Sequence, residues 1–169
     1  MATTDAAALH HSNVLPFLIK EVYGLQKGCI GFPPIEQMIA DGAIAAETVY
    51  EMYEAKLCGG QKESGEGYDI FHFVEEEKVL KEIKLRTLLT KDRSWGTERS
   101  AGLTANDTRC KIADIIMGVY NPHRNTLDRF LLPIGDGYTP GKTVTITYSL
   151  TGDHYNSNEK YLLSSSPLN

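Results

Sequence analysis

Hydrophobic residues follow a helical period in the first third of the chain. The spacing predicts helices over residues 12–26, from Pro34 to Gly42, and over residues 43–57, where two consecutive glycines end the last of them. In this last helix the apolar side chains lie on one side. Three glutamates follow the opposite side: Glu47, Glu51 and Glu54.

From residue 68 onward the hydrophobic pattern has a period of two, which is typical of β-strands. Residues 68–74 and 79–89 are predicted to form a hairpin around an acidic turn. Three further strands are predicted, over residues 112–120, 127–134 and 142–150. Helices followed by strands predict an α/β (α+β) fold, with a central mixed β-sheet flanked by helices.

The stretches between these elements are polar and contain glycine. Residues 61–67 are predicted to form a flexible loop, and residues 91–109 a functional loop or a short helix between turns. The strand at 142–150 is expected to form a hairpin with residues 160–165. The chain, residues 1–169, is predicted to be a single domain.

Composition and charge narrow the class of protein. Apolar residues make up 41% and charged residues 23% of the chain, which excludes a disordered protein. No apolar run is long enough for a membrane span, and the N-terminal residues lack a signal-peptide pattern. Three cysteines without CxxC spacing argue against a disulfide scaffold or a zinc site. We therefore expect a cytoplasmic protein without membrane association.

The net charge of −5 is unevenly distributed. Residues 84–111 have a formal charge of +4, and the remainder of the chain has −9. A basic strip beside a carboxylate-rich stretch is suited to a metal-dependent enzyme that acts on a polyanion, because the cations attract phosphate and the carboxylates hold the metal.

The predicted hairpin brings candidate catalytic residues together. Alternation places Glu82 and Lys84 on one face of the second strand and Ile83 in the core. Asp69 begins the first strand, so its carboxyl group can approach that of Glu82. Two neighbouring carboxylates are suitable ligands for Mg²⁺, and a lysine beside them can act on an attacking water or stabilise phosphate charge. These groups are the ones that metal-assisted phosphodiester hydrolysis requires.

These residues resemble a known signature. Asp69 followed by Glu82-x-Lys84 is similar to the D…(D/E)-x-K motif of the PD-(D/E)xK nuclease superfamily, which includes many type II restriction endonucleases. Residues 47–134 as a whole resemble this family, including the later strand pair that completes its sheet. The resemblance implies a restriction-endonuclease-like fold, with an N-terminal helical part (1–42), a catalytic core (43–134) and a C-terminal β-hairpin (135–169).

The resemblance also implies roles for individual residues. Asp69 and Glu82 would hold Mg²⁺, and Lys84 would act on the attacking water. Glu54, followed by a turn that ends in glycine, resembles the helix-borne glutamate of MutH-like nicking endonucleases, as an outer acid or a ligand of a second metal. Glu47 and Glu51 lie on the same predicted helix face and are alternatives for that role.

The implied substrate is double-stranded DNA, cut at specific sites. A palindromic site requires two catalytic centres related by a two-fold axis, so a homodimer is expected, with a nicking monomer as the variant. The cationic and amide side chains expected to contact phosphates or base edges are Arg86, Lys91, Arg93, Arg99, Asn106 and Arg109.

Two other classes of protein fit parts of the sequence. Residues 35–57 have the length and central glycine of a helix-turn-helix, which would make the protein a DNA-binding regulator without catalysis. Glu47 and Glu51 on the second of these helices would repel DNA. Alternatively, the acidic part of the chain could serve a small inhibitor or immunity-type protein that binds a basic target.

Overall fold

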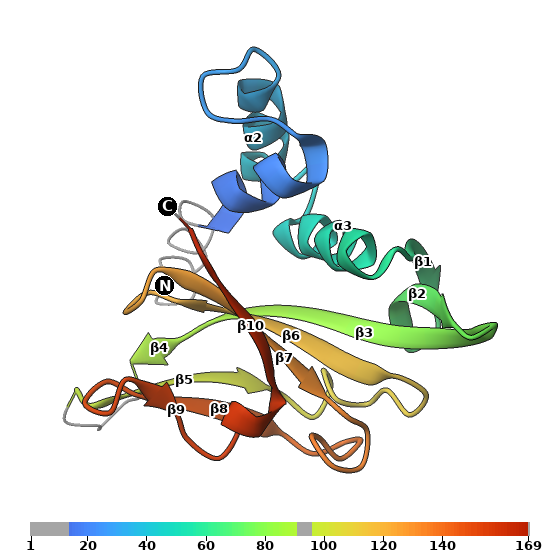
Figure 1. Ribbon diagram of the computed structural model, residues 1–169, viewed down its shortest axis with the longest axis vertical. Coiled ribbons are helices and arrows are strands. Elements are labelled where there is room, and N and C mark those ends of the chain that lie inside the picture. The colour runs from blue at the N-terminus through green and yellow to red at the C-terminus, as the bar shows by residue number, and fades with distance from the viewer. Residues whose placement is uncertain (1–13, 91–95, 169) are drawn as a thin grey trace.

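The computed structural model of the chain describes residues 14–90 and 96–168 (Figure 1). Its helices are a first helix over residues 14–23, α2 (Phe32–Ala40) and α3 (Ala46–Cys58). These helices confirm the three predicted from the sequence. Within the described residues no helix combines the length and the apolar character that crossing a membrane requires.

The strands occupy most of the chain after residue 60. They are β1 (Gln61–Gly65), β2 (Tyr68–Val74), β3 (Glu77–Thr87), β4 (Leu89–Thr90), β5 (Glu98–Leu103), β6 (Asp114–Asn121), β7 (Thr126–Leu132), β8 (Val144–Ser149), β9 (His154–Tyr155) and β10 (Leu162–Pro167), with a short 3-10 helix at Glu159–Tyr161. A six-stranded sheet has the order β1-β2-β3-β6-β7-β10, and a four-stranded sheet has the order β4-β5-β8-β9. In the large sheet β3 and β6 are parallel and all other neighbours are antiparallel. The predicted mixed sheet flanked by helices is confirmed, and the second sheet is an addition.

The large sheet is covered on both faces. The helices pack on one face and the four-stranded sheet on the other (Figure 1). Side chains of β6 alternate between the two cores, with Ile116 under the helices and Ile115 and Met117 between the sheets. This burial on both sides explains why β6 is an almost continuous apolar run.

Two of the predicted loops contain strands. Residues 61–65 form β1, which pairs with β2 at the edge of the large sheet, and residues 98–103 form β5, which pairs with β8. The polar residues of both segments gave no alternating apolar pattern. β1 is an edge strand, which backbone hydrogen bonds can stabilise without an apolar face, and β5 buries only Ala101 and Leu103.

The predicted pairing of residues 142–150 with residues 160–165 is wrong. β8 pairs with β5 and β9 in the small sheet, whereas β10 pairs with β7 in the large sheet. Both strands alternate in polarity, so either could pair with the other by pattern alone. Their partners are set instead by the stacking of the two sheets, which places the chain after β9 beside β7.

A glycine fixes how closely α3 approaches the large sheet. Gly118 lies in β6 under α3, and a Cβ atom there would lie 2.4 Å from Cζ of Tyr50. The ring of Tyr50 is fully buried in this position, and its hydroxyl donates a 2.5 Å hydrogen bond to Glu54. The close contact holds α3 against the strands whose residues form the candidate site.

Candidate functional site

The candidate site lies where β2 and β3 separate. Their backbone pairing begins at Ile70 and Lys81, so the following part of β3 has no strand on this side. Two carboxylates instead accept hydrogen bonds from backbone N–H groups of β3. The Ile83 N–H donates to Asp69 Oδ2 at 2.7 Å, and the Leu85 N–H donates to Glu47 Oε2 at 3.1 Å. Acidic side chains therefore replace a strand along the open edge of β3.

The open edge brings Asp69, Glu82 and Lys84 together. Glu82 and Lys84 project from the face that meets the small sheet, with 15% and 17% of their side chains exposed, and Lys84 Nζ lies 3.3 Å from Glu82 Oε1. Burial and the negative charge of Asp69 raise the pKa of Glu82, because both disfavour a second carboxylate. Between them on β3, Ile83 is fully buried on the helix side, as alternation predicted.

A cleft of about 720 Å³ opens over these three residues. Asp69, Glu82 and Lys84 line it from the strands, and Asn106, Asp107 and Arg109 line it from the segment between β5 and β6. The cleft therefore joins carboxylates and cations, which is the combination needed to approach a phosphodiester through a divalent ion.

Asp107 connects this segment to β3. Its Oδ1 atom lies 3.0 Å from Arg86 Nη2 and 3.9 Å from Lys84 Nζ. Burial opposes ionisation of Asp107, but hydrogen bonds from Thr104 and the charge of Arg86 outweigh burial and lower its pKa. Sequence reasoning counted Asp107 only as an anion in the basic strip, although an aspartate three residues after a threonine is a turn signal.

Glu51 on α3 interacts electrostatically with Asp69. Its side chain is 12% exposed and lies 3.3 Å from Lys62 on β1. Burial and the charge of Asp69 raise the pKa of Glu51, despite the opposing charge of Lys62. Glu51 and Lys62 thus form an acid–base pair beside Asp69, and Lys62 had no signal in the sequence because β1 was expected to be a loop.

Glu54 is not part of the cleft, which corrects the expectation that it supports the metal site. It is 1% exposed and makes two 2.6 Å hydrogen bonds with Arg129, through Nε and Nη2. Tyr50, one turn earlier, points the same way into the sheet. Arg129 projects from β7 toward α3 with only 15% of its side chain exposed, so its charge needs an acid beside it, and Glu54 supplies that acid.

The predicted DNA contacts divide into four groups. Asn106 and Arg109 line the cleft. Arg86 lies beside the cleft, where it is bound to Glu47 at 3.1 Å as well as to Asp107. Arg99 lies on β5 and does not line the cleft. Lys91 and Arg93 lie outside the described residues.

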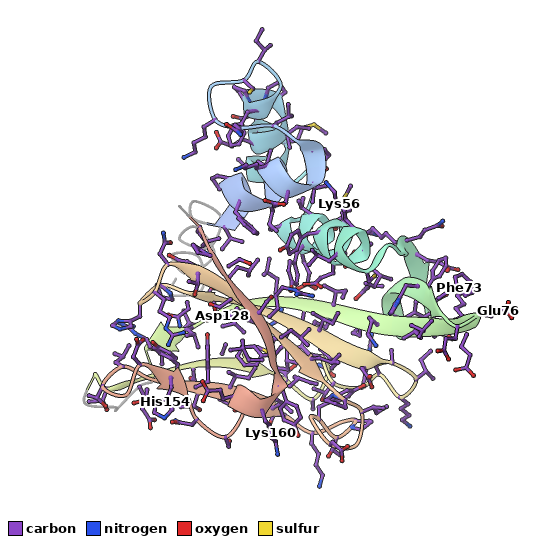
Figure 2. All side chains as sticks on the ribbon, in the orientation of Figure 1. Lys56, Phe73, Glu76, Asp128, His154 and Lys160 are labelled. Atoms are coloured by element: carbon purple, nitrogen blue, oxygen red, sulfur yellow. The ribbon has the colours of Figure 1, made fainter. Side chains whose placement is uncertain are left out.

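The acidic turn of the β2–β3 hairpin lies away from the site. Glu75 and Glu76 form its tip with left-handed φ angles of 51° and 71°, and Figure 2 shows Glu76 at the free end of the hairpin. Asp69 lies at the opposite end of β2. The cluster of three glutamates is therefore separate from the catalytic candidates.

The donor set of the cleft fits Mg²⁺. Among the described residues no three His, Cys, Asp or Glu side chains are grouped to hold a metal by themselves. Mg²⁺ does not require such a cage, since it commonly binds one or two carboxylates and takes water and phosphate oxygens for the rest. Asp69 and Glu82 provide those two carboxylates.

The geometry of α3 argues against a recognition helix. Val49, Tyr50 and Tyr53 are buried against the body of the protein, and Glu47 contacts β3. The face that would have to enter the major groove is thus occupied.

Comparison of the chain with models of protein families, with curated proteins and with solved structures finds no match.

Proposed function

We propose that the protein is a Mg²⁺-dependent endodeoxyribonuclease with a restriction-endonuclease-like fold, which hydrolyses phosphodiester bonds in double-stranded DNA at specific sites. The observation that carries the proposal is the convergence of Asp69, Glu82 and Lys84 in one cleft. The order of elements supports it as well, since an antiparallel meander β1-β2-β3 is followed by a strand parallel to β3.

The residues have distinct tasks in this proposal. Asp69 and Glu82 would hold the metal. Burial and then the charge of Asp69 raise the pKa of Glu82, and a divalent cation would relieve the repulsion between the two carboxylates. When bound, Mg²⁺ supplies a Lewis acid for the phosphate and lowers the pKa of a bound water. Lys84 lies within 3.3 Å of Glu82, where its ammonium group can hold the attacking water or stabilise charge on the phosphate.

Other residues of the cleft support substrate binding. Arg109 provides positive charge for the DNA backbone or a base edge, and Asn106 provides an amide. Glu51, which the sequence analysis gave as an alternative to Glu54, is paired with Lys62 and is not among the residues that line the cleft. Cleavage of both strands at a palindrome requires two such clefts, so we propose that the active form is a homodimer.

The decisive experiment is incubation of the protein with supercoiled plasmid and phage DNA, with Mg²⁺ and with EDTA. We expect discrete fragments with Mg²⁺ and none with EDTA. Asp69→Asn, Glu82→Gln and Lys84→Ala should each lower the cleavage rate by at least about 100-fold, because each removes a group from the reaction itself. Nicked circles alone would indicate a nicking monomer.

The chain contains a matched control for these variants. Lys78 and Glu63 form a similar ion pair at 3.4 Å on β3 and β1, but their side chains are 44% and 42% exposed and lie outside the cleft. Lys78→Ala and Glu63→Gln should cleave as fast as the wild type. A wild-type protein that leaves every DNA intact, or a Lys84→Ala variant with full activity, would overturn the proposal.

A further inference from the structure

The segment that faces the catalytic strand is an internally braced turn. Asp107 Oδ2 accepts hydrogen bonds from the Thr104 amide at 2.8 Å and from the Thr104 hydroxyl at 3.0 Å. The fully buried Thr108 donates from its hydroxyl to the Lys142 carbonyl at 2.6 Å, and its own carbonyl accepts from the Gly141 amide at 3.0 Å. The turn is thus fastened to the chain before β8.

The two oxygens of Asp107 have different partners. Oδ2 closes the turn, whereas Oδ1 points to β3 and lies 3.0 Å from Arg86 and 3.9 Å from Lys84. Arg86 is itself bound to Glu47 on α3 at 3.1 Å. A single carboxylate therefore links the shape of the turn to the position of the catalytic strand.

The residues on either side of Asp107 are available for a ligand. Asn106 and Arg109 are exposed and line the cleft, and within the described residues neither side chain has a hydrogen bond or an ion pair. Amide and guanidinium groups are the ones that form paired hydrogen bonds with adenine and guanine edges. Their placement relative to Lys84 depends on Asp107.

We infer that Asp107 is a positioning residue that couples the turn 104–109 to the catalytic strand. Through Oδ2 it fixes Asn106 and Arg109, and through Oδ1 it restrains Lys84 and Arg86. This inference rests on the proposed nuclease function. The coupling makes cleavage depend on correct engagement of the turn with DNA, because an error of about 1 Å at the reacting groups lowers a rate by as much as about 100-fold.

The removal of the charge of Asp107 and the loss of its positioning role should change the cleavage rate in opposite directions, so the direction of the change distinguishes the two. Asp107 places a negative charge in a cleft that binds a polyanion, and Asp107→Asn should therefore strengthen DNA binding. If Asp107 served only as a surface anion, cleavage would rise or stay constant. A positioning role requires slower turnover in spite of equal or tighter binding.

The first measurement is steady-state cleavage of a plasmid by the full-length wild type and by Asp107→Asn. We expect kcat to fall about 10- to 100-fold with KM unchanged or lower, and the share of cuts at non-preferred sequences to rise. Asp136→Asn is the control, since Asp136 is an exposed turn residue outside the cleft, and it should match the wild type. Unchanged kcat in Asp107→Asn would overturn the inference.

The second measurement needs no DNA. Arg86→Gln removes the shorter of the two contacts from Asp107 to β3 but keeps the hydrogen bonds inside the turn. Amide hydrogen exchange at Thr104 and Thr108 should accelerate at least about 5-fold, and exchange at residues 123–124 should not change. Unchanged exchange in the turn would overturn the coupling even if the wild type cleaves DNA. Faster exchange with an inactive wild type would instead overturn the proposed function, and the positioning role with it.

Discussion

Two glutamate–cation pairs lie on opposite faces of the large sheet and differ in their surroundings. Glu54 and Arg129 are paired through both carboxylate oxygens under α3, and Glu54 is 1% exposed. Glu82 and Lys84 are paired through a single 3.3 Å contact on the other face, next to a second carboxylate, Asp69. The first pair is electrically balanced, whereas the second contains an excess of acid. The difference separates a group that holds the fold together from the group that we propose as the metal site.

The position of each strand in the sheet explains this difference. β7 lies between β6 and β10, so the backbone around Arg129 is paired on both sides. β3 loses its neighbour β2 at the site, and acidic side chains fill the gap. Asp128 is fully buried in β7 and is visible inside the body in Figure 2. Hydroxyl groups of Thr126, Tyr155 and Ser165 donate hydrogen bonds to it, so it is satisfied by neutral donors.

The same substitution in the two pairs provides the strongest test of the comparison. Glu54→Gln should lower the free energy of unfolding by about 3 kcal/mol or more, because it leaves the guanidinium of Arg129 buried without its counter-charge. Chemical denaturation measures this loss. An unfolding free energy within about 1 kcal/mol of the wild type would mean that the Glu54–Arg129 pair is not the structural element we describe.

Removal of a neighbouring core side chain tests the facing of β3. Ile83→Ala should destabilise the protein by about 2–5 kcal/mol, since Ile83 is fully buried in the helix-side core between Glu82 and Lys84. The control is Ile112→Ala, because Ile112 is 58% exposed at the rim of the cleft, and its effect should stay within about 0.5 kcal/mol. Equal effects of the two substitutions in thermal or urea unfolding would contradict the assigned facing.

Local pattern was sufficient to predict β3, the strand that contains Glu82 and Lys84. A period of two defined both faces of β3, and spacing across the hairpin placed Asp69 opposite Glu82. Helix punctuation was equally informative, since Gly59 ends α3 in a left-handed conformation with φ of 67°. These features depend on neighbours close in sequence, which is why they could be predicted.

Features that depend on distant partners could not be predicted. Glu54 faces the large sheet, where it binds Arg129, 75 residues away in the sequence. The spacing of the glutamates along α3 did not indicate this contact. β10 joined β7 instead of β8 because the two sheets stack. Asp107 lines the cleft, and Lys62 pairs with Glu51, through a turn and a strand whose residues are polar, so hydrophobic periodicity contained no signal for either.

The smallest expected effect concerns Glu82 beside Asp69, where the substitution by glutamine should raise the free energy of unfolding, whereas it lowers it at Glu54. Glu82→Gln should stabilise the protein at neutral pH by up to about 1 kcal/mol, because it removes a charge that burial and Asp69 disfavour. The raised pKa means that the folded state takes up a proton before the unfolded state does as the pH falls. As the pH falls through the raised pKa of Glu82, the wild type therefore regains the stability that the buried charge had cost it. The extra stability of Glu82→Gln over the wild type should vanish below the pKa of an ordinary glutamate, about 4.3.

Urea unfolding of the wild type and Glu82→Gln between about pH 4 and pH 8 measures this effect, with Glu63→Gln on β1 as the control. The difference between Glu82→Gln and the wild type should grow as the pH rises and then level off, whereas the control should show no such growth. A Glu82→Gln variant that is less stable than the wild type at neutral pH would place Glu82 in the same class as Glu54. Glu82 would then be a charge whose loss the fold cannot tolerate, and the excess of acid that distinguishes the cleft would not exist.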